Sequence, residues 1–166
     1  MPGKRKAAKG SAIIEFTLST VPIIFVTVSL IQMSLGMWNY HTVAETVKAV
    51  TRTASVRGVG CASLACALNV GQITQLIAAK GIGLTPSSLN VTLTDTNGSI
   101  SCNPVTTCYS NTTVWPRSGA NSLNQLISIS AKYSFSSAIA MFVPSKGSTN
   151  FGTVTLGAIS QQVIDF

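Results

Sequence analysis

Hydrophobic and polar positions follow three different patterns along this chain of 166 residues. A polar and basic stretch at 1–10 leads into 23 consecutive uncharged residues, from Phe16 to Trp38. Between Val43 and Ala54 apolar residues recur at spacings of four, three and four, which is typical of one face of a helix. From Leu89 the period changes to two, which is typical of half-buried strands. The pattern therefore predicts a long helix followed by a sheet.

The uncharged segment is long enough to cross a membrane. At 1.5 Å rise per residue its helix spans about 35 Å, against a hydrocarbon core of about 30 Å. Lys and Arg precede it and few follow, which predicts a cytoplasmic N-terminus and an exported remainder. Trp38, Tyr40 and His41 follow the segment, where an aromatic belt would lie. Pro22 removes one helical hydrogen bond, so we expect a kink or a loosened turn there.

Two helical stretches are expected beyond the apolar segment. The first is the continuation of the long helix through 42–58, which Gly58-Val59-Gly60 should end. Its apolar stripe should pack against this protein's own globular part. The second runs from about Ala67 to Lys80 and should stop at Gly81.

The strands are expected in the second half of the chain. Leu89 begins an alternating run that leads to Asn97-Gly98, a hairpin signal. The clearest half-buried strand runs from Ile127 to Phe135, and the closing stretch 151–166 predicts one or two strands interrupted at Gly157. The apolar run within 136–147 is expected to be a loop or a short helix. A small antiparallel sheet packed on a helix makes the fold class α+β.

Composition and charge exclude several classes of protein. Hydrophobic residues make up 46% of the chain and charged residues only 9%, against roughly 25% in ordinary soluble domains. The chain has 21 Ser and 19 Thr, which supply polarity without charge. Disordered proteins have the opposite composition. The net charge of +7 comes largely from Lys4, Arg5, Lys6 and Lys9, so no basic face for nucleic acid is expected.

Four cysteines lie beyond the apolar segment: Cys61, Cys66, Cys102 and Cys108. An even number of cysteines in an exported domain predicts two disulfides. Three connectivities are possible, and we expect the local pairs Cys61–Cys66 and Cys102–Cys108. A zinc site would be the alternative, but the spacings are poor for it and no histidine accompanies the cysteines.

Catalytic motifs are absent from the sequence. There is no G-x-S-x-G, P-loop or H-E-x-x-H motif, and His41 is the only histidine. Asp95 and Asp165 stand too far apart from other carboxylates to suggest an acid–base pair. We therefore expect neither an enzyme nor a cofactor or metal.

Glu15 is an unusual residue at the start of an apolar span, because a carboxylate is costly in a bilayer. It either lies at the interface and reaches water, or it has a partner. Cleavage between Gly10 and Ser11 would make Ser11 the N-terminus and Glu15 the fifth residue. The new ammonium could then pair with the carboxylate.

The segment from Lys9 to Phe16 resembles a class III signal peptide of type IV pilins and pseudopilins. The resemblance implies cleavage after Gly10 by a prepilin peptidase, which leaves the apolar helix attached. An aromatic residue directly after Glu15, then Leu18, Pro22 and an aliphatic run, are similar to the TadE family of the tight-adherence (Flp) pilus. This resemblance covers about residues 9–58. The mature start Ser-Ala-Ile-Ile differs from the Phe-Thr-Leu of many type IV pilins, which favours the tight-adherence class over type II secretion pseudopilins.

The resemblance implies a minor pilin or pseudopilin that helps to initiate or regulate pilus assembly and adherence. Its parts would be a leader at 1–10, a transmembrane and stalk helix at 11–58 and an exported disulfide-containing domain at 59–166. Its location would be the inner membrane with a periplasmic domain, or the pilus after assembly. Implied partners are the prepilin peptidase, other pilin subunits, the inner-membrane assembly platform and membrane lipid, with Glu15 and Phe16 acting in helix docking.

Two alternatives from other classes stay open at this point. One is a membrane-anchored periplasmic binding module that never polymerises. The other is a secreted soluble enzyme, cut after Ser34-Leu35-Gly36 so that it begins at Met37.

Overall fold

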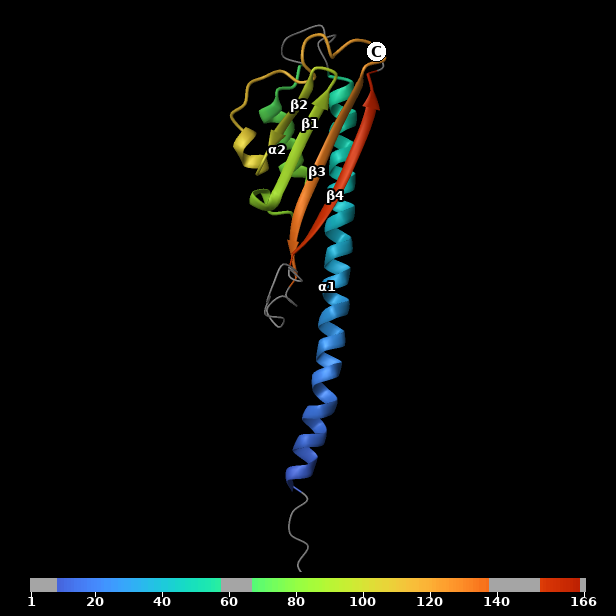
Figure 1. The fold of residues 1–166 in the computed structure, drawn as a ribbon, viewed down its shortest axis with the longest axis vertical. Helices are drawn as coiled ribbons and strands as arrows, with labels where there is room; N and C mark the ends of the chain where they lie inside the picture. Colours follow the sequence, from blue (N-terminus) through green and yellow to red (C-terminus); the bar gives the residue numbers. More distant parts are fainter. Residues whose placement is uncertain (1–8, 58–66, 138–152, 165–166) are drawn as a thin grey trace, which may run out of the picture.

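The computed structural model describes residues 9–57, 67–137 and 153–164. One long helix, α1 (Lys9–Ser55), runs out of a small domain that packs against one side of its C-terminal part (Figure 1). The domain adds the helix α2 (Val70–Lys80), the 3-10 turns η1 (Pro86–Ser88) and η2 (Val105–Cys108), and one four-stranded sheet. The α+β class expected from the sequence is confirmed.

All neighbouring strands of the sheet are antiparallel, in the order β2-β1-β3-β4. The strands are β1 (Leu89–Asp95), β2 (Gly98–Cys102), β3 (Leu126–Ser136) and β4 (Thr153–Val163). The expected hairpin turn joins β1 to β2, where Asp95 pairs with Gly98. Gly98 has φ of 123°, a backbone conformation that side chains disfavour.

The expected interruption at Gly157 is wrong, because β4 is one strand that runs through this residue. Gly157 pairs with Lys132 of β3, and the ladder is unbroken from Val163 to Thr153. A Cβ added at Gly157 would lie 3.9 Å from the nearest atom, the carbonyl oxygen of Ala131. Glycine is thus tolerated here in a regular register and marks neither a bulge nor a close approach.

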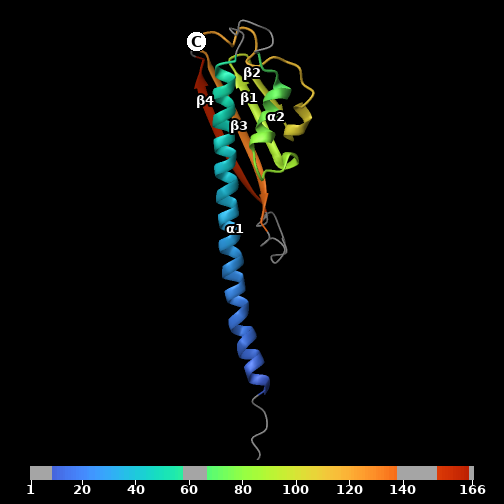
Figure 2. The same ribbon diagram turned by 180° about the vertical axis from the view of Figure 1, so that it is seen from behind.

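Both helices cover the same face of the sheet (Figure 2). The predicted stripe on α1 is almost fully buried, with Val43, Val47 and Ala54 each 1% exposed and Val50 0%. This stripe forms one core with the inward side chains of β1 and β3 and with the buried face of α2. The stripe therefore packs against the protein's own domain, as expected.

Hydroxyl side chains make up much of the opposite face of the sheet. Thr92 of β1 pairs with Ser101 of β2 on one side and with Ser130 of β3 on the other. The next row repeats the pattern with Thr94 between Ser99 and Ser128. Short hydroxyl side chains on strands give a polar face without charge. This explains how so few charged residues suffice for the solvent side of the sheet.

The second helix begins three residues later than the sequence suggested, at Val70 instead of Ala67. Asn69 is its N-cap: its Oδ1 accepts from the Gln72 N–H at 2.7 Å, and its own N–H donates to Gln72 Oε1 at 3.1 Å. This reciprocal cap fixes the start of the helix at Val70, because it satisfies N–H groups that have no partner within the helix. The expected stop is confirmed, since Gly81 donates its N–H to the Ile77 carbonyl at 3.0 Å.

The first helix ends at Ser55, where the Arg57 N–H donates to the Ala54 carbonyl at 3.3 Å. The segment Gly58-Val59-Gly60, expected to end it, lies outside the described residues. The apolar run 138–143, expected as part of a loop or short helix, lies outside them as well.

Candidate functional site

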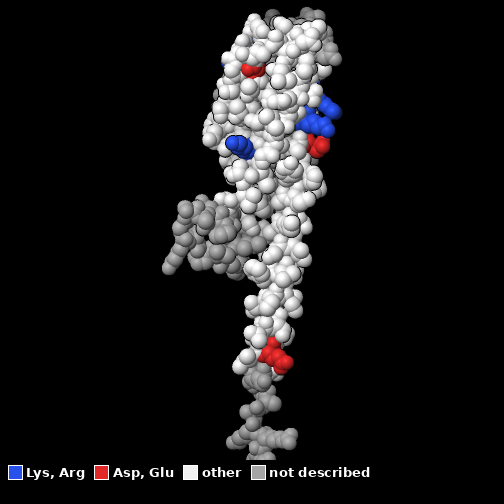
Figure 3. All heavy atoms as spheres, turned by 45° about the vertical axis from the view of Figure 1, so that its right-hand side comes forward, with Lys and Arg blue, Asp and Glu red and all other residues white. Residues whose placement is uncertain are grey.

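The N-terminal half of α1 exposes a long apolar surface. Large apolar side chains between Ile13 and Tyr40 are exposed, from 45% at Tyr40 to 77% at Leu18. Figure 3 shows this half as nearly free of charge, with acidic atoms only near its lower end. Of the described residues from 12 to 44, Glu15 alone is charged. The helix is long and apolar enough to cross a membrane.

Several hydroxyl groups in this apolar half donate to carbonyl groups of their own helix. Ser19 donates to the Glu15 carbonyl at 3.0 Å, Thr27 to the Ile23 carbonyl at 2.8 Å, and Ser34 to the Leu30 carbonyl at 2.9 Å. In lipid a hydroxyl without a partner is costly, so back-bonding of this kind makes Ser and Thr compatible with a spanning helix. The hydroxyl groups bonded in this way therefore do not argue against a spanning helix.

The residues proposed for processing and docking lie in the first turns of α1. The helix includes Gly10 and Ser11, so Ser11 and Glu15 are four residues apart, one helical turn. The side chains are described from Ala12 onward; Glu15 is exposed and Phe16 is 69% exposed. The structure thus presents Glu15 and Phe16 to the surroundings of the helix. The roles of these residues stay predictions.

Pro22 lies within α1, which continues through it as a helix. Pro22 has no N–H for the carbonyl one turn below, the Leu18 carbonyl. The kink expected at this point stays a prediction.

A groove lies where the exposed half of α1 meets the lower ends of β3 and β4. Its volume is about 430 Å³, and its lining is almost entirely apolar. The helix contributes Met33, Gly36 and Met37, and the strands contribute Phe135 and Leu156. A Cβ added at Gly36 would lie 3.8 Å from the Phe135 ring, an ordinary contact distance, so the strand end lies next to the helix at this point. This groove was not predicted, because helix and hairpin meet only in the tertiary fold.

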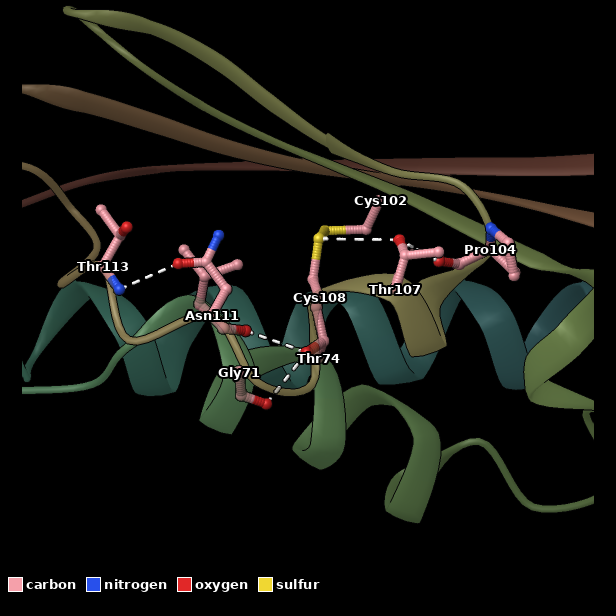
Figure 4. Close-up of a disulfide and its surroundings, with 9 residues drawn as sticks. Gly71, Thr74, Cys102, Pro104, Thr107, Cys108, Asn111 and Thr113 are labelled. Atoms are coloured by element: carbon pink, nitrogen blue, oxygen red, sulfur yellow. Dashed lines mark hydrogen bonds between the residues drawn. A yellow bond between two sulfur atoms is a disulfide. The ribbon is translucent and has the colours of Figure 1, made fainter.

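The disulfide Cys102–Cys108 is present, with an S–S distance of 2.00 Å (Figure 4). It joins the end of β2 to η2, and both cysteines are buried, Cys102 at 0% and Cys108 at 7% exposure. One of the two expected pairs is confirmed. Cys61 and Cys66 lie outside the described residues, so their pairing stays a prediction.

The chain that follows the disulfide packs directly against the first turn of α2 (Figure 4). The Gly71 N–H donates to the Asn111 carbonyl at 2.9 Å, and the Val70 N–H donates to the Thr113 carbonyl at 2.9 Å. A Cβ added at Gly71 would lie 2.5 Å from the carbonyl oxygen of Tyr109. The helix and this loop therefore meet backbone to backbone, which only glycine allows.

An ion pair between Asp95 and Arg117 was missed by the sequence argument. The Arg117 Nη2 lies 2.7 Å from Asp95 Oδ1, and Asp95 is 5% exposed. The Arg117 N–H and Nε also donate to Oδ2, and the Asn97 N–H donates to Oδ1. Burial alone would raise the pKa of the Asp95 carboxyl, but these hydrogen bonds and the Arg117 charge together hold that pKa below its ordinary value. The pair fixes the β1–β2 turn to the loop after Trp115 and is structural.

Metal-ligating residues do not gather in the part of the chain that the structure describes, where no three His, Cys, Asp or Glu residues come together. His41 is exposed, and its ring makes an edge contact with Tyr40 at 5.8 Å between centroids. Trp38, Tyr40 and His41 follow one another closely along α1 at the end of its apolar half, where an aromatic belt at a membrane interface would lie.

An exposed apolar helix that continues without a break into the core of a small α+β domain defines a class of protein with one protruding apolar helix and one attached domain. Within that class, residues 10–52 match the model of the TadE family, described as TadE-like protein. The match begins at Gly10 and ends inside the buried part of α1, so it covers the helix and not the sheet. It confirms the resemblance to TadE-like proteins of the tight-adherence pilus, which are not a family of enzymes.

Searches of curated proteins and of solved structures found no match.

Proposed function

We propose that this chain is a minor pilin or pseudopilin of a tight-adherence pilus, processed by a prepilin peptidase between Gly10 and Ser11. The observation that carries the proposal is the TadE match over residues 10–52, which starts at the proposed cleavage site and follows the exposed helix into the domain. The protein helps to initiate or regulate assembly of the pilus and thereby adherence. It is held in the inner membrane before assembly, with its domain in the periplasm.

Cleavage creates a new charge close to Glu15. The ammonium of Ser11 lies one helical turn from the Glu15 carboxylate, and in an apolar environment two such charges attract strongly. The same carboxylate could pair with the new ammonium of a neighbouring subunit, which would align two helices during docking. Phe16, exposed beside Glu15, supplies the adjacent apolar contact.

The partners follow from these roles. The peptidase acts at the cytoplasmic face, where the leader lies. Other pilin subunits contact the exposed half of α1, and the assembly platform in the inner membrane receives the processed subunit. The exported domain contacts further minor subunits.

The first test is to map the N-terminus of the membrane-extracted protein by intact mass and peptide sequencing, from cells with and without the prepilin peptidase. We expect a start at Ser11 that requires the peptidase. A start at Met37 would refute the proposal and make the protein a secreted domain. A retained leader in peptidase-positive cells would also refute processing and leave a membrane-anchored binding module.

The second test compares Glu15→Gln with Glu45→Gln, since both glutamates are exposed on α1 but only Glu15 lies in the apolar half. We expect Glu15→Gln to reduce surface pili sharply while the subunit remains processed and present in the membrane. Glu45→Gln should leave pilus number unchanged. Equal pilus numbers in the two variants would contradict the docking role of Glu15.

A further inference from the structure

The groove between α1 and the ends of β3 and β4 lies at the depth of the membrane surface. About 20 residues of helix cross a hydrocarbon core of about 30 Å. Counted from Ala12 or from Phe16, such a span ends near Ile31 or Leu35. The helix residues of the groove run from Ser29 to Tyr40 and straddle this boundary. The strand ends that form the other wall are therefore carried down to the outer face of the bilayer.

The chemistry of the groove suits hydrocarbon. None of its described lining side chains is charged, and Phe135, Val154 and Leu156 form the strand wall. The hydroxyl of Ser29, on the helix wall, is already used, because it donates to the Phe25 carbonyl at 2.8 Å. A volume of about 430 Å³ lies within the range of about 300–1,000 Å³ that is usual for ligand pockets.

The groove is continuous with the lipid-exposed surface of the helix. Met33 and Met37 line it and are also 69% and 56% exposed. Methionine is flexible and adapts to irregular apolar ligands. A chain that lies along α1 in the outer leaflet can thus enter the groove without crossing a polar rim of charged residues.

We propose that this groove binds the acyl chain of an outer-leaflet phospholipid, so that the β3–β4 end is a second membrane contact of the protein besides the spanning helix. The proposal rests on α1 being membrane-inserted but not on pilus assembly. It has one consequence for the domain: a lipid between helix and strands fixes the height and the tilt of the sheet above the bilayer.

The test is quenching of tryptophan fluorescence by brominated phosphatidylcholine, with the full-length protein in liposomes. A Trp38→Phe background removes the exposed native tryptophan, while Trp115 is fully buried and serves as a constant signal. Phe135→Trp reports on the groove. Leu126→Trp is the matched control at the other end of β3, nine residues away or about 30 Å. Phe25→Trp reports on the middle of the span.

We expect Phe135→Trp to lose at least half as much emission as Phe25→Trp, most strongly with bromine near the headgroup end of the acyl chain. Leu126→Trp should lose none. Quenching of Phe135→Trp no greater than that of Leu126→Trp, with Phe25→Trp quenched, would overturn the lipid groove alone. Absence of quenching at both Phe25→Trp and Phe135→Trp would overturn the membrane anchor together with the groove.

Two other occupants are distinguished in the same assay. The chain's own apolar residues 138–143 follow Ser137 directly. If they fill the groove, Phe135→Trp will be quenched only after Ile139, Met141 and Phe142 are replaced by Ser, which overturns the proposal. If the helix of a second copy fills it, quenching of Phe135→Trp will fall as the protein-to-lipid ratio rises, which also overturns it.

Discussion

Truncation of a valine should lower the stability of the protein in one half of α1 and not in the other. Val50 is 0% exposed in the core, whereas Val26, on the same helix, is 56% exposed. Val→Ala removes two methyl groups at each position. At about 0.8 kcal/mol per buried methyl-sized group, Val50→Ala loses about 1.6 kcal/mol of transfer free energy. A cavity of about 50 Å³ adds about 1 kcal/mol at 24 cal/mol per Å³.

The expected loss of unfolding free energy for Val50→Ala is thus about 2.5 kcal/mol, or a drop in Tm of roughly 5–15 °C for a domain of this size. Val26→Ala should change Tm by less than about 2 °C, because an exposed site loses little burial. The assay is thermal unfolding of the detergent-extracted protein, followed by the fluorescence of the buried Trp115. Equal shifts in Tm in the two variants would refute the view that only the C-terminal half of α1, which carries Val50, belongs to the domain core.

Three further experiments test other contacts. The pKa of Asp95 is lowered in the folded protein, so the stabilisation from its carboxylate is present above the unfolded pKa of about 3.9 and is lost as the pH falls through the folded value. Asp95→Asn should therefore have a lower Tm than the wild type at neutral pH, and the two Tm values should converge in acid. A constant difference in Tm at every pH would contradict this. Replacement of both Cys102 and Cys108 by Ser should lower the unfolding free energy by about 2 kcal/mol, the loop-closure contribution of the bond, in denaturant titrations, whereas an unchanged midpoint would argue against a stabilising bond. Gly71→Ala should destabilise the domain strongly because its Cβ would meet a backbone oxygen at 2.5 Å, while Gly157→Ala should be tolerated; melting curves of the two variants give the comparison.

Local patterns predicted most of the elements of this fold. The valine stripe of α1 and the alternation in β3 are periodicities within one segment, and the side chains that form them are buried as the pattern requires. The boundaries were less predictable. Asn69 sets the start of α2 through a cap with Gln72, and Gly157 is accepted inside a regular strand. Both outcomes depend on specific hydrogen bonds and not on hydrophobic period.

The tertiary contacts were beyond the sequence argument for a different reason. Asp95 and Arg117 are 22 residues apart, and no local pattern indicates that a turn and a later loop will meet. The groove likewise needs a helix and a hairpin that are distant in sequence, with Gly36 against Phe135. The proposed processing residues are the reverse case: Gly10, Ser11 and Glu15 were recognisable in sequence as a short linear motif and need no tertiary contact.

The continuity of α1 has a mechanical consequence. The helix runs from the apolar half into the core without a joint, and β3 and β4 lie alongside its upper part (Figure 1). A force along the helix axis, applied at the N-terminal end of α1, therefore loads all the buried valines of the stripe at the same time. The helix would have to slide past the sheet as a whole, with its side chains interlocked, before any one contact could open alone. Such an interface resists load in shear, so the exposed half of α1 and the domain should move together as one rigid body when the N-terminal end of the helix is pulled.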